Sequence, residues 1–126
     1  MMVADEMSNL ASVYYEMGAP EKAAPLYLAS IKIIEAKLGK THQLTATMLN
    51  NLALVYCESK KYKEAEALYL RCLKIDESAL GKDHLQVAVT LDNLARLYMS
   101  MEKHNQAKQY RERSRKIKQT ARDKTE

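Results

Sequence analysis

The sequence predicts an all-α protein: a right-handed α-solenoid of three stacked helix-turn-helix units. Two observations predict this fold. The chain has 126 residues with only three Gly and two Pro, and its wealth of Ala, Leu, Glu, Lys and Met favours helix by intrinsic propensity. The triplet Asn-Leu-Ala also occurs three times at a spacing of 42 residues, starting at Asn9, Asn51 and Asn93. Such a repeat indicates one supersecondary unit that buries its apolar face only by stacking on neighbours.

The repeat extends well beyond the triplet. A tyrosine, an alanine and an isoleucine follow each triplet at constant offsets. They are Tyr14, Tyr56 and Tyr98, then Ala23, Ala65 and Ala107, then Ile33, Ile75 and Ile117. We therefore expect one repeat domain over residues 1–121, with repeats at about 1–40, 41–82 and 83–121, followed by a basic or polar tail at residues 122–126.

In the first repeat, the turn between the two helices is expected at residues 18–20. Pro20 suits a first helical position, where no backbone N–H is needed. Pro25 falls inside the second helix, where proline removes a hydrogen-bond donor and crowds the preceding turn. The sequence therefore predicts a kink or a late start for that helix.

The second repeat has the clearest periodicity. Leu44, Met48, Leu52, Val55 and Tyr56 follow one helical stripe. This first helix is expected to end near Ser59, and a second apolar stripe runs from Tyr62 to Leu80. Gly81 then suits a left-handed helix end, and Asp83 suits an N-cap for the next helix. Gly39 and Thr41 are the equivalent residues that close the first repeat.

The third repeat leads into a basic C-terminal end. The whole chain has a net charge of +4, but residues 103–126 hold nine Lys or Arg against three acids, or +6. Arg111, Arg115 and Lys118 share one helix face, which suits a last helix that no further repeat covers. Attraction to nucleic acid or an anionic membrane is the alternative. Nucleic acid is disfavoured because Tyr110 is the only aromatic residue available for stacking on bases.

Catalytic and metal-binding functions are disfavoured. His42 and His84 are equivalent loop residues, His104 lies at an expected helix start, and none pairs with a candidate nucleophile. No His, Cys, Asp and Glu group has the spacing of metal ligands. The sequence thus predicts neither an enzyme nor a cofactor.

Cysteine usage and hydropathy indicate a cytoplasmic protein. Cys57 and Cys72 form neither a CxxC pair nor a disulfide framework, so reduced thiols are expected. No apolar stretch approaches the roughly 20 residues that span a bilayer. Asp5 and Glu6 are unlike the start of a secretory signal.

The repeat residues resemble the tetratricopeptide repeat (TPR). The run Leu52-Ala53, Tyr56, Ala65 and Tyr69 carries this resemblance. The 42-residue unit, opening with Leu-Asn-Asn-Leu-Ala and closing with Leu-Gly-Lys-Asp-His, is similar to the repeats of kinesin light chains and nephrocystin-3-like proteins. The resemblance covers about residues 5–120. Two departures are Gln43 and Leu85, which stand where these relatives often have Pro.

The resemblance implies a concave groove that binds a peptide segment of a protein partner, with an adaptor or scaffold role. The Asn of each triplet would bond the peptide backbone, because Asn offers both a donor and an acceptor. The alternative is that these Asn side chains bond the neighbouring repeat. The expected binding residues are Asn9, Ser12, Tyr15, Asn50, Asn51, Leu54, Glu58, Asp92, Asn93 and Arg96.

The expected groove has an acidic character. Asp5, Glu16, Glu58 and Asp92 against Arg96 give it a charge of −3. A neutral or basic peptide is therefore favoured, and the acidic tail that the chaperone-binding class of these repeats grips with paired Lys is disfavoured. The alternative function is a structural array that forms homo-oligomers through its open first helix, or a fragment of a longer chain.

Overall fold

The computed structural model describes residues 3–125, and every regular element in this range is an α-helix. The fold class predicted from the sequence is confirmed. The helices are α1 (Ala4–Glu16), α2 (Pro20–Leu38), α3 (Gln43–Glu58), α4 (Tyr62–Leu80), α5 (Leu85–Ser100) and α6 (His104–Thr125).

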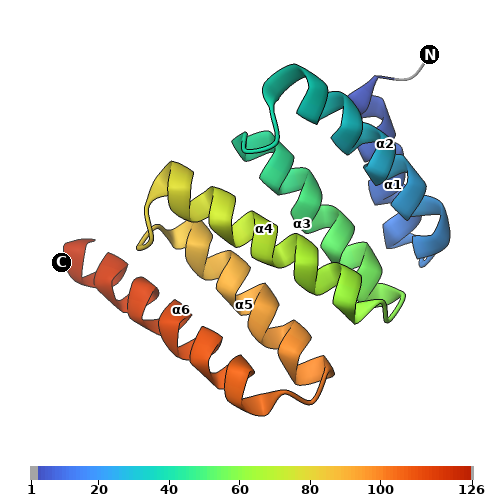
Figure 1. Ribbon diagram of the computed structural model, residues 1–126. Coiled ribbons are helices and arrows are strands. Elements are labelled where there is room, and N and C mark those ends of the chain that lie inside the picture. Colours follow the sequence, from blue (N-terminus) through green and yellow to red (C-terminus); the bar gives the residue numbers. More distant parts are fainter. Residues whose placement is uncertain (1–2, 126) are drawn as a thin grey trace.

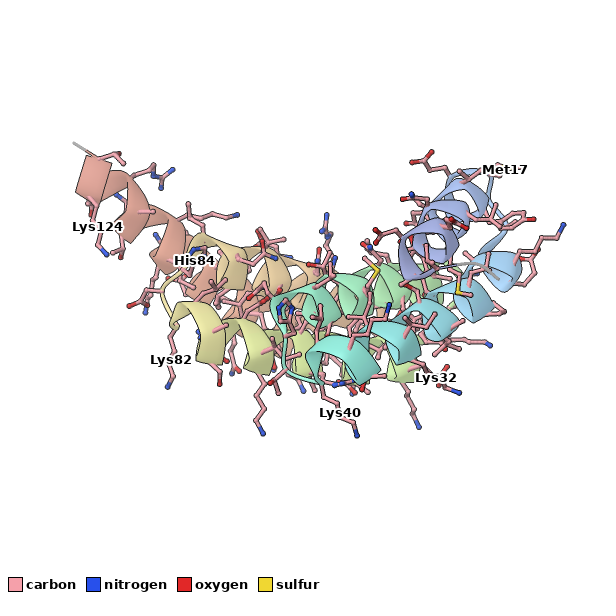
Figure 2. All side chains as sticks on the ribbon, turned by 90° about the horizontal axis from the view of Figure 1, so that it is seen from above. Met17, Lys32, Lys40, Lys82, His84 and Lys124 are labelled. Carbon is pink, nitrogen blue, oxygen red and sulfur yellow. The ribbon has the colours of Figure 1, made fainter. Side chains whose placement is uncertain are left out.

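The helices form three antiparallel hairpins that stack side by side (Figure 1). Within each hairpin α1 packs on α2, α3 on α4, and α5 on α6, while α2–α3 and α4–α5 contacts join successive repeats. The array is a shallow crescent (Figure 2). Met17 and Lys124 mark its two ends, and Lys32, Lys40 and Lys82 point from its convex side.

Small side chains let the two helices of each hairpin approach closely. The alanines at the equivalent positions of all three repeats are at most 2% exposed. They are Ala11 with Ala23, Ala53 with Ala65, and Ala95 with Ala107. The core divides into two clusters, one spanning each boundary between repeats. Burial is therefore continuous along the array, as stacking requires.

One hydrogen bond recurs in every repeat and fixes the stagger of the paired helices. A side chain in the middle of the second helix donates to a backbone carbonyl near the start of the first. The bonds run from Ser30 to Ala4 (3.0 Å), Cys72 to Ala46 (3.2 Å) and Ser114 to Ala88 (3.3 Å). Donors and acceptors both advance by 42 residues, so the hairpins share one geometry.

The predicted N-caps at Thr41 and Asp83 are wrong by one residue. The Nδ1 atoms of His42 and His84 accept hydrogen bonds from the backbone N–H groups of Leu44 and Gln86, each at 3.0 Å. The imidazole nitrogen reaches the same amide that a capping carboxylate would satisfy. Capping preferences rank Asp and Thr among the leading residues, which led the prediction to the neighbouring position.

The glycines at the repeat boundaries are needed, but their predicted conformation is wrong. Gly39 has φ 95° and ψ 165°, and Gly81 has φ 89° and ψ 154°. This region combines a positive φ with an extended ψ and is essentially restricted to glycine, whereas the left-handed helical region has ψ near 47°. The chain therefore leaves each hairpin extended.

Pro25 does not delay the start of α2. The helix begins at Pro20, as expected, and runs on through Pro25, so the late start is wrong. Pro25 lies in the second turn, where its missing donor leaves only the carbonyl of Glu21 without its helical partner.

The two ends of the array differ from its middle. Leu52 and Leu94 are 1% and 0% exposed, but their equivalent Leu10 is only partly buried. The reason is that no described residue packs on the outer face of α1. At the other end, α6 continues to Thr125 and includes residues 122–125. Within residues 3–125, no helix is long and apolar enough to cross a membrane.

Candidate peptide-binding groove

A hollow of about 330 Å³ lies between α1 and α3. Five of the ten predicted binding residues line it, together with Ser8, Glu16, Tyr27 and Met48. The five are Asn9, Ser12, Tyr15, Asn51 and Leu54. Repeat geometry brings them together because each lies on the first helix of its hairpin, and these helices advance in register.

A second hollow, of about 380 Å³, opens between α3, α4 and α5 and includes Asn50. Asp76 also lines it although the residue is only 2% exposed. The two carboxylate oxygens of Asp76 accept hydrogen bonds from Gln43 at 2.8 Å and Thr90 at 2.9 Å. The buried charge is thus satisfied by neutral donors from both neighbouring first helices.

The three Asn side chains of the expected ladder are not equivalent. Asn9 is exposed, Asn51 is partly buried, and Asn93 is only 6% exposed. The Asn93 NH₂ group donates to the side-chain oxygen of Asn50 at 2.9 Å, and its own oxygen accepts from Arg96. Asn93 therefore has the inter-repeat role that the sequence left as the alternative.

Ser8 explains why the first boundary stays open. Ser8 and Asn51 are the equivalents of Asn50 and Asn93, 42 residues earlier. The Ser8 hydroxyl donates to the carbonyl of Asp5 at 3.1 Å, and no hydrogen bond joins it to Asn51 among the residues described. The amide of Asn51 therefore faces the hollow instead of the preceding repeat.

Lys118 neutralises the acidic group at the third repeat. Its ammonium group lies 2.6 Å from the Asp92 carboxylate. Partial burial, the largest single effect, raises the pKa of Asp92, but hydrogen bonds and nearby cations, chiefly Lys118, together lower that pKa below its ordinary value. The acidic character is therefore concentrated at the first two repeats.

Tyr15 and Glu58 connect the first two repeats electrostatically. Burial first, and then the negative charge of Glu58, raise the pKa of the Tyr15 hydroxyl. The hydroxyl is therefore protonated at neutral pH and can act as a donor to a ligand carbonyl. Glu58 itself is exposed at the end of α3.

Sequence reasoning missed Tyr27 and Met48, which border the hollow between α1 and α3. The apolar stripe marked Met48 as a core residue, and both Tyr27 and Met48 are largely buried. That part of each side chain also borders the groove becomes apparent only from the lining of the hollow. No group of three or more metal-ligating side chains occurs in the described part of the chain.

A tetratricopeptide repeat family model matches residues 3–78 and, overlapping, residues 44–120. The chain belongs to the tetratricopeptide repeat family. The two matches advance along the chain by about one TPR unit, in agreement with the 42-residue repeat. No curated protein sequence is significantly similar to the chain.

Solved TPR structures share the fold over 93% of the chain. The crystal structure of BtubC (BKLC) from P. vanneervenii matches with 30% identity and a TM-score of 0.87. Two structures of TPR-like repeats assigned to a kinesin light chain of Podosopora anserina match with 22% and 21% identity and TM-scores of 0.83 and 0.82. The chain spans about half of their lengths: 46%, 55% and 56%.

These matches confirm the resemblance to kinesin light chain repeats. They support a coarse function, because the TPR fold is a protein-interaction scaffold. The hollow between α1 and α3 of this TPR chain brings amide, hydroxyl and apolar groups together.

Proposed function

We propose that this TPR chain binds an extended segment of a partner protein in the groove between α1 and α3. The observation that carries the proposal is the hollow in which Asn9, Asn51 and Tyr15 converge. Each of these side chains can bond a peptide group, while Leu54 supplies an apolar contact. Asn93 lies outside this hollow, where its NH₂ group bonds Asn50 at the next boundary between repeats.

The groove favours a neutral or basic segment. Glu16 lines the hollow and the negative charge of Glu58 acts on the Tyr15 hydroxyl, whereas Asp92 is already paired with Lys118. A Lys or Arg side chain of the ligand would therefore be attracted to the first two repeats. Because surface potentials govern encounter more than affinity, this preference should appear most clearly in the association rate.

We further propose an adaptor or scaffold role in the cytoplasm. The supporting observation is the similarity to TPR-like repeats assigned to kinesin light chain. In such a role the groove holds one partner while other surfaces of the array remain available. The peptide sequence that the groove prefers follows from the experiment below.

The test begins with peptides selected from a random library displayed on phage. Affinities of the selected peptides are then measured for the native chain and for Asn9→Ala/Asn51→Ala. We expect about tenfold weaker binding, because each lost hydrogen bond contributes about 0.5–1.5 kcal/mol. Circular dichroism must show an unchanged helix content.

Asn105→Ala is the matched control, because Asn105 is an exposed asparagine at the start of α6, away from the groove. Its peptide affinities should equal those of the native chain. Equal binding by the double variant and the native chain would refute the groove as the binding site.

Self-association is the second candidate function, and one observation favours it. Val13 on α1 is 49% exposed, whereas its equivalents Val55 and Leu97 are 0% and 2% exposed. Light scattering over a range of concentrations separates the two functions. A strict monomer supports the groove, and a dimer that Val13→Glu dissociates supports the end face.

A further inference from the structure

Two hollows on the convex side of the array are copies of one another. The first, of about 490 Å³, is lined by Glu35, Lys40, Thr41, Arg71, Lys74, Ile75 and Ser78. The second, of about 360 Å³, is lined by Glu77, Lys82, Asp83, Arg113, Lys116, Ile117 and Thr120. All seven residues advance by 42, so each boundary between repeats forms the same pocket. We name them the first and second seam pockets.

The basic side chains are retained in both copies. Lys40, Arg71 and Lys74 become Lys82, Arg113 and Lys116. With its acidic residue counted, the first pocket carries +2, whereas the second carries +1 because Asp83 replaces Thr41. Both pockets are therefore cationic, although the groove at the first two repeats is acidic.

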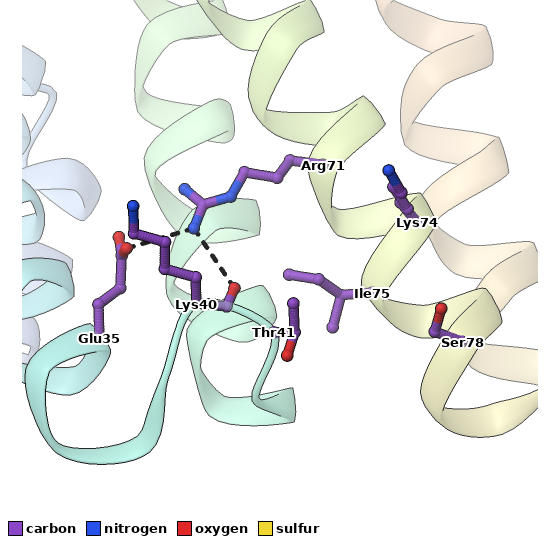
Figure 3. A pocket seen from close by; sticks show the side chains of 7 residues that line it. All are labelled: Glu35, Lys40, Thr41, Arg71, Lys74, Ile75 and Ser78. Atoms are coloured by element: carbon purple, nitrogen blue, oxygen red, sulfur yellow. Dashed lines mark hydrogen bonds and ion pairs between the residues drawn. The ribbon is translucent and has the colours of Figure 1, made fainter.

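An ion pair across the seam holds the wall of each pocket. Arg71 on α4 lies 3.4 Å from Glu35 on α2 and also donates to the carbonyl of Lys40 at 3.3 Å (Figure 3). Arg113 on α6 lies 2.7 Å from Glu77 on α4. Each arginine is thus held by a carboxylate of the preceding repeat.

The lysines take part in no ion pair within residues 3–125. In the first pocket, Thr41 and Ile75 lie between Lys40 on one side and Lys74 on the other (Figure 3). The floor is thus aliphatic, with the Thr41 hydroxyl beside it and a lysine side chain on either side. Figure 2 shows that Lys40 and Lys82 point from the same side of the crescent.

We propose that the seam pockets bind an acidic polypeptide segment, with one Asp or Glu side chain or a short acidic run in each pocket. The methylene stem of a glutamate would lie on Ile75 or Ile117, and its carboxylate would bond the two lysines and the Ser78 or Thr120 hydroxyl. A segment that fills both pockets gains affinity from the second contact at high effective concentration.

The pocket chemistry favours carboxylate ligands over nucleic acid and lipid. None of the described lining residues is aromatic, so bases have no surface for stacking. Glu35 and Glu77 stand inside the pockets and repel a doubly charged phosphate more than a single carboxylate. A recessed pocket on a convex surface admits a side chain more readily than a flat bilayer.

The probe is a fluorescein-labelled hexaglutamate peptide, whose binding to the full chain is followed by anisotropy. We expect at least tenfold weaker binding for Lys40→Glu/Lys74→Glu, because the ligand loses two charge-assisted hydrogen bonds. Lys82→Glu/Lys116→Glu should weaken binding less, since Asp83 already disfavours an anion there. All four lysines are exposed, so both variants should fold.

The control is Lys32→Glu/Lys63→Glu, which makes the same charge change at exposed positions of α2 and α4 outside both pockets. At physiological salt, where the Debye length is about 8 Å, its affinity should change by less than about twofold. An equal loss in the control and the pocket variants overturns the proposal, because net charge alone would then explain binding. The groove variant Asn9→Ala/Asn51→Ala should bind hexaglutamate like the native chain, which separates this site from the proposed function.

Further arms distinguish the ligand class. Millimolar inorganic phosphate should displace hexaglutamate poorly. A single-stranded oligonucleotide and a phosphatidylserine vesicle are tested in the same way. The assignment to peptide is overturned if either binds more tightly than hexaglutamate and loses more affinity in the pocket variants. Amide resonances of Thr41 and Ser78 should shift on addition of hexaglutamate, and unchanged resonances contradict binding in the first pocket.

Discussion

The side-chain NH₂ group of Asn93 donates a 2.9 Å hydrogen bond to the side-chain oxygen of Asn50, and this bond ties the third repeat to the second. At the first boundary the equivalent residues are Asn51 and Ser8, which form no such bond among the residues described. The same asparagine position is thus structural at one boundary and open toward the groove at the other.

The contribution of the Asn50–Asn93 bond can be measured by a double-mutant cycle. Asn93→Ala and Asn50→Ala should each lower the free energy of unfolding, and the coupling energy should be about 0.5–1.5 kcal/mol. Urea unfolding of the two single variants and the double variant provides the values. Coupling near zero would show that the bond contributes nothing beyond the separate contacts.

Asp76 and Thr90 form a buried polar pair where the first boundary has an apolar one. Their equivalents 42 residues earlier are Ile34 and Met48, both buried. Thr90→Met should destabilise the chain by about 1–3 kcal/mol, because the Asp76 carboxylate loses a donor while buried. Thermal or urea unfolding checks this value.

The double variant Asp76→Ile/Thr90→Met copies the first boundary and should recover most of the lost stability. Replacing both members of a buried polar pair with apolar groups is often nearly neutral. If the double variant is less stable than Thr90→Met alone, the two boundaries differ in packing shape and the repeat equivalence fails at this point.

The fold could be predicted from the sequence because its cause is periodic. Each of Leu52, Tyr56 and Ala65 has equivalents at the same offset, so three copies support every assignment. The caps were harder to predict, because the choice between Asp83 and His84 depends on a local turn that periodicity does not specify.

The groove could be predicted only in part, because equivalent residues meet different neighbours. Asn9, Asn51 and Asn93 occupy the same repeat position, yet Asn93 meets Asn50 and Asn51 meets the shorter Ser8. Asn9 is exposed because it lies on α1, whose outer face no described residue covers. The seam pockets were missed for another reason. Their lysines repeat at 42 residues, but exposed lysines carry no apolar signal and resemble ordinary solvated surface.

The Cys72 thiol should be inert in the folded protein. Burial first, and then the charge of Asp76, raise its pKa to about 12. In the unfolded chain the thiol has a pKa of about 8.5. The neutral thiol therefore contributes stability below about pH 8.5, and that contribution is lost as the pH rises toward 12. Alkylation at pH 8 should label Cys72 only after denaturation, and rapid labelling of the native chain would contradict its burial.

Backbone conformation alone should determine the effect of replacing the boundary glycines. A Cβ atom at Gly81 would have no heavy atom within 4 Å, but φ is 89°. Gly81→Ala should therefore destabilise the chain by about 1–3 kcal/mol through strain. Gly18→Ala is the control and should cost less, because the equivalents Lys60 and Glu102 adopt φ of 62° and 60° with full side chains. Equal losses in the two variants would contradict this explanation.

Val13 and Val55 provide a matched test of what one repeat gains from the repeat before it. They are the same residue at the same position of successive units, 49% and 0% exposed. Val55→Ala should lower the free energy of unfolding by about 2 kcal/mol, because a fully buried side chain loses apolar contact. Val13→Ala should change it by less than about 0.5 kcal/mol, as is usual at the surface. Both values come from urea unfolding at two protein concentrations. A large, concentration-dependent loss for Val13→Ala would mean that another molecule covers α1, which would favour self-association over the free end face.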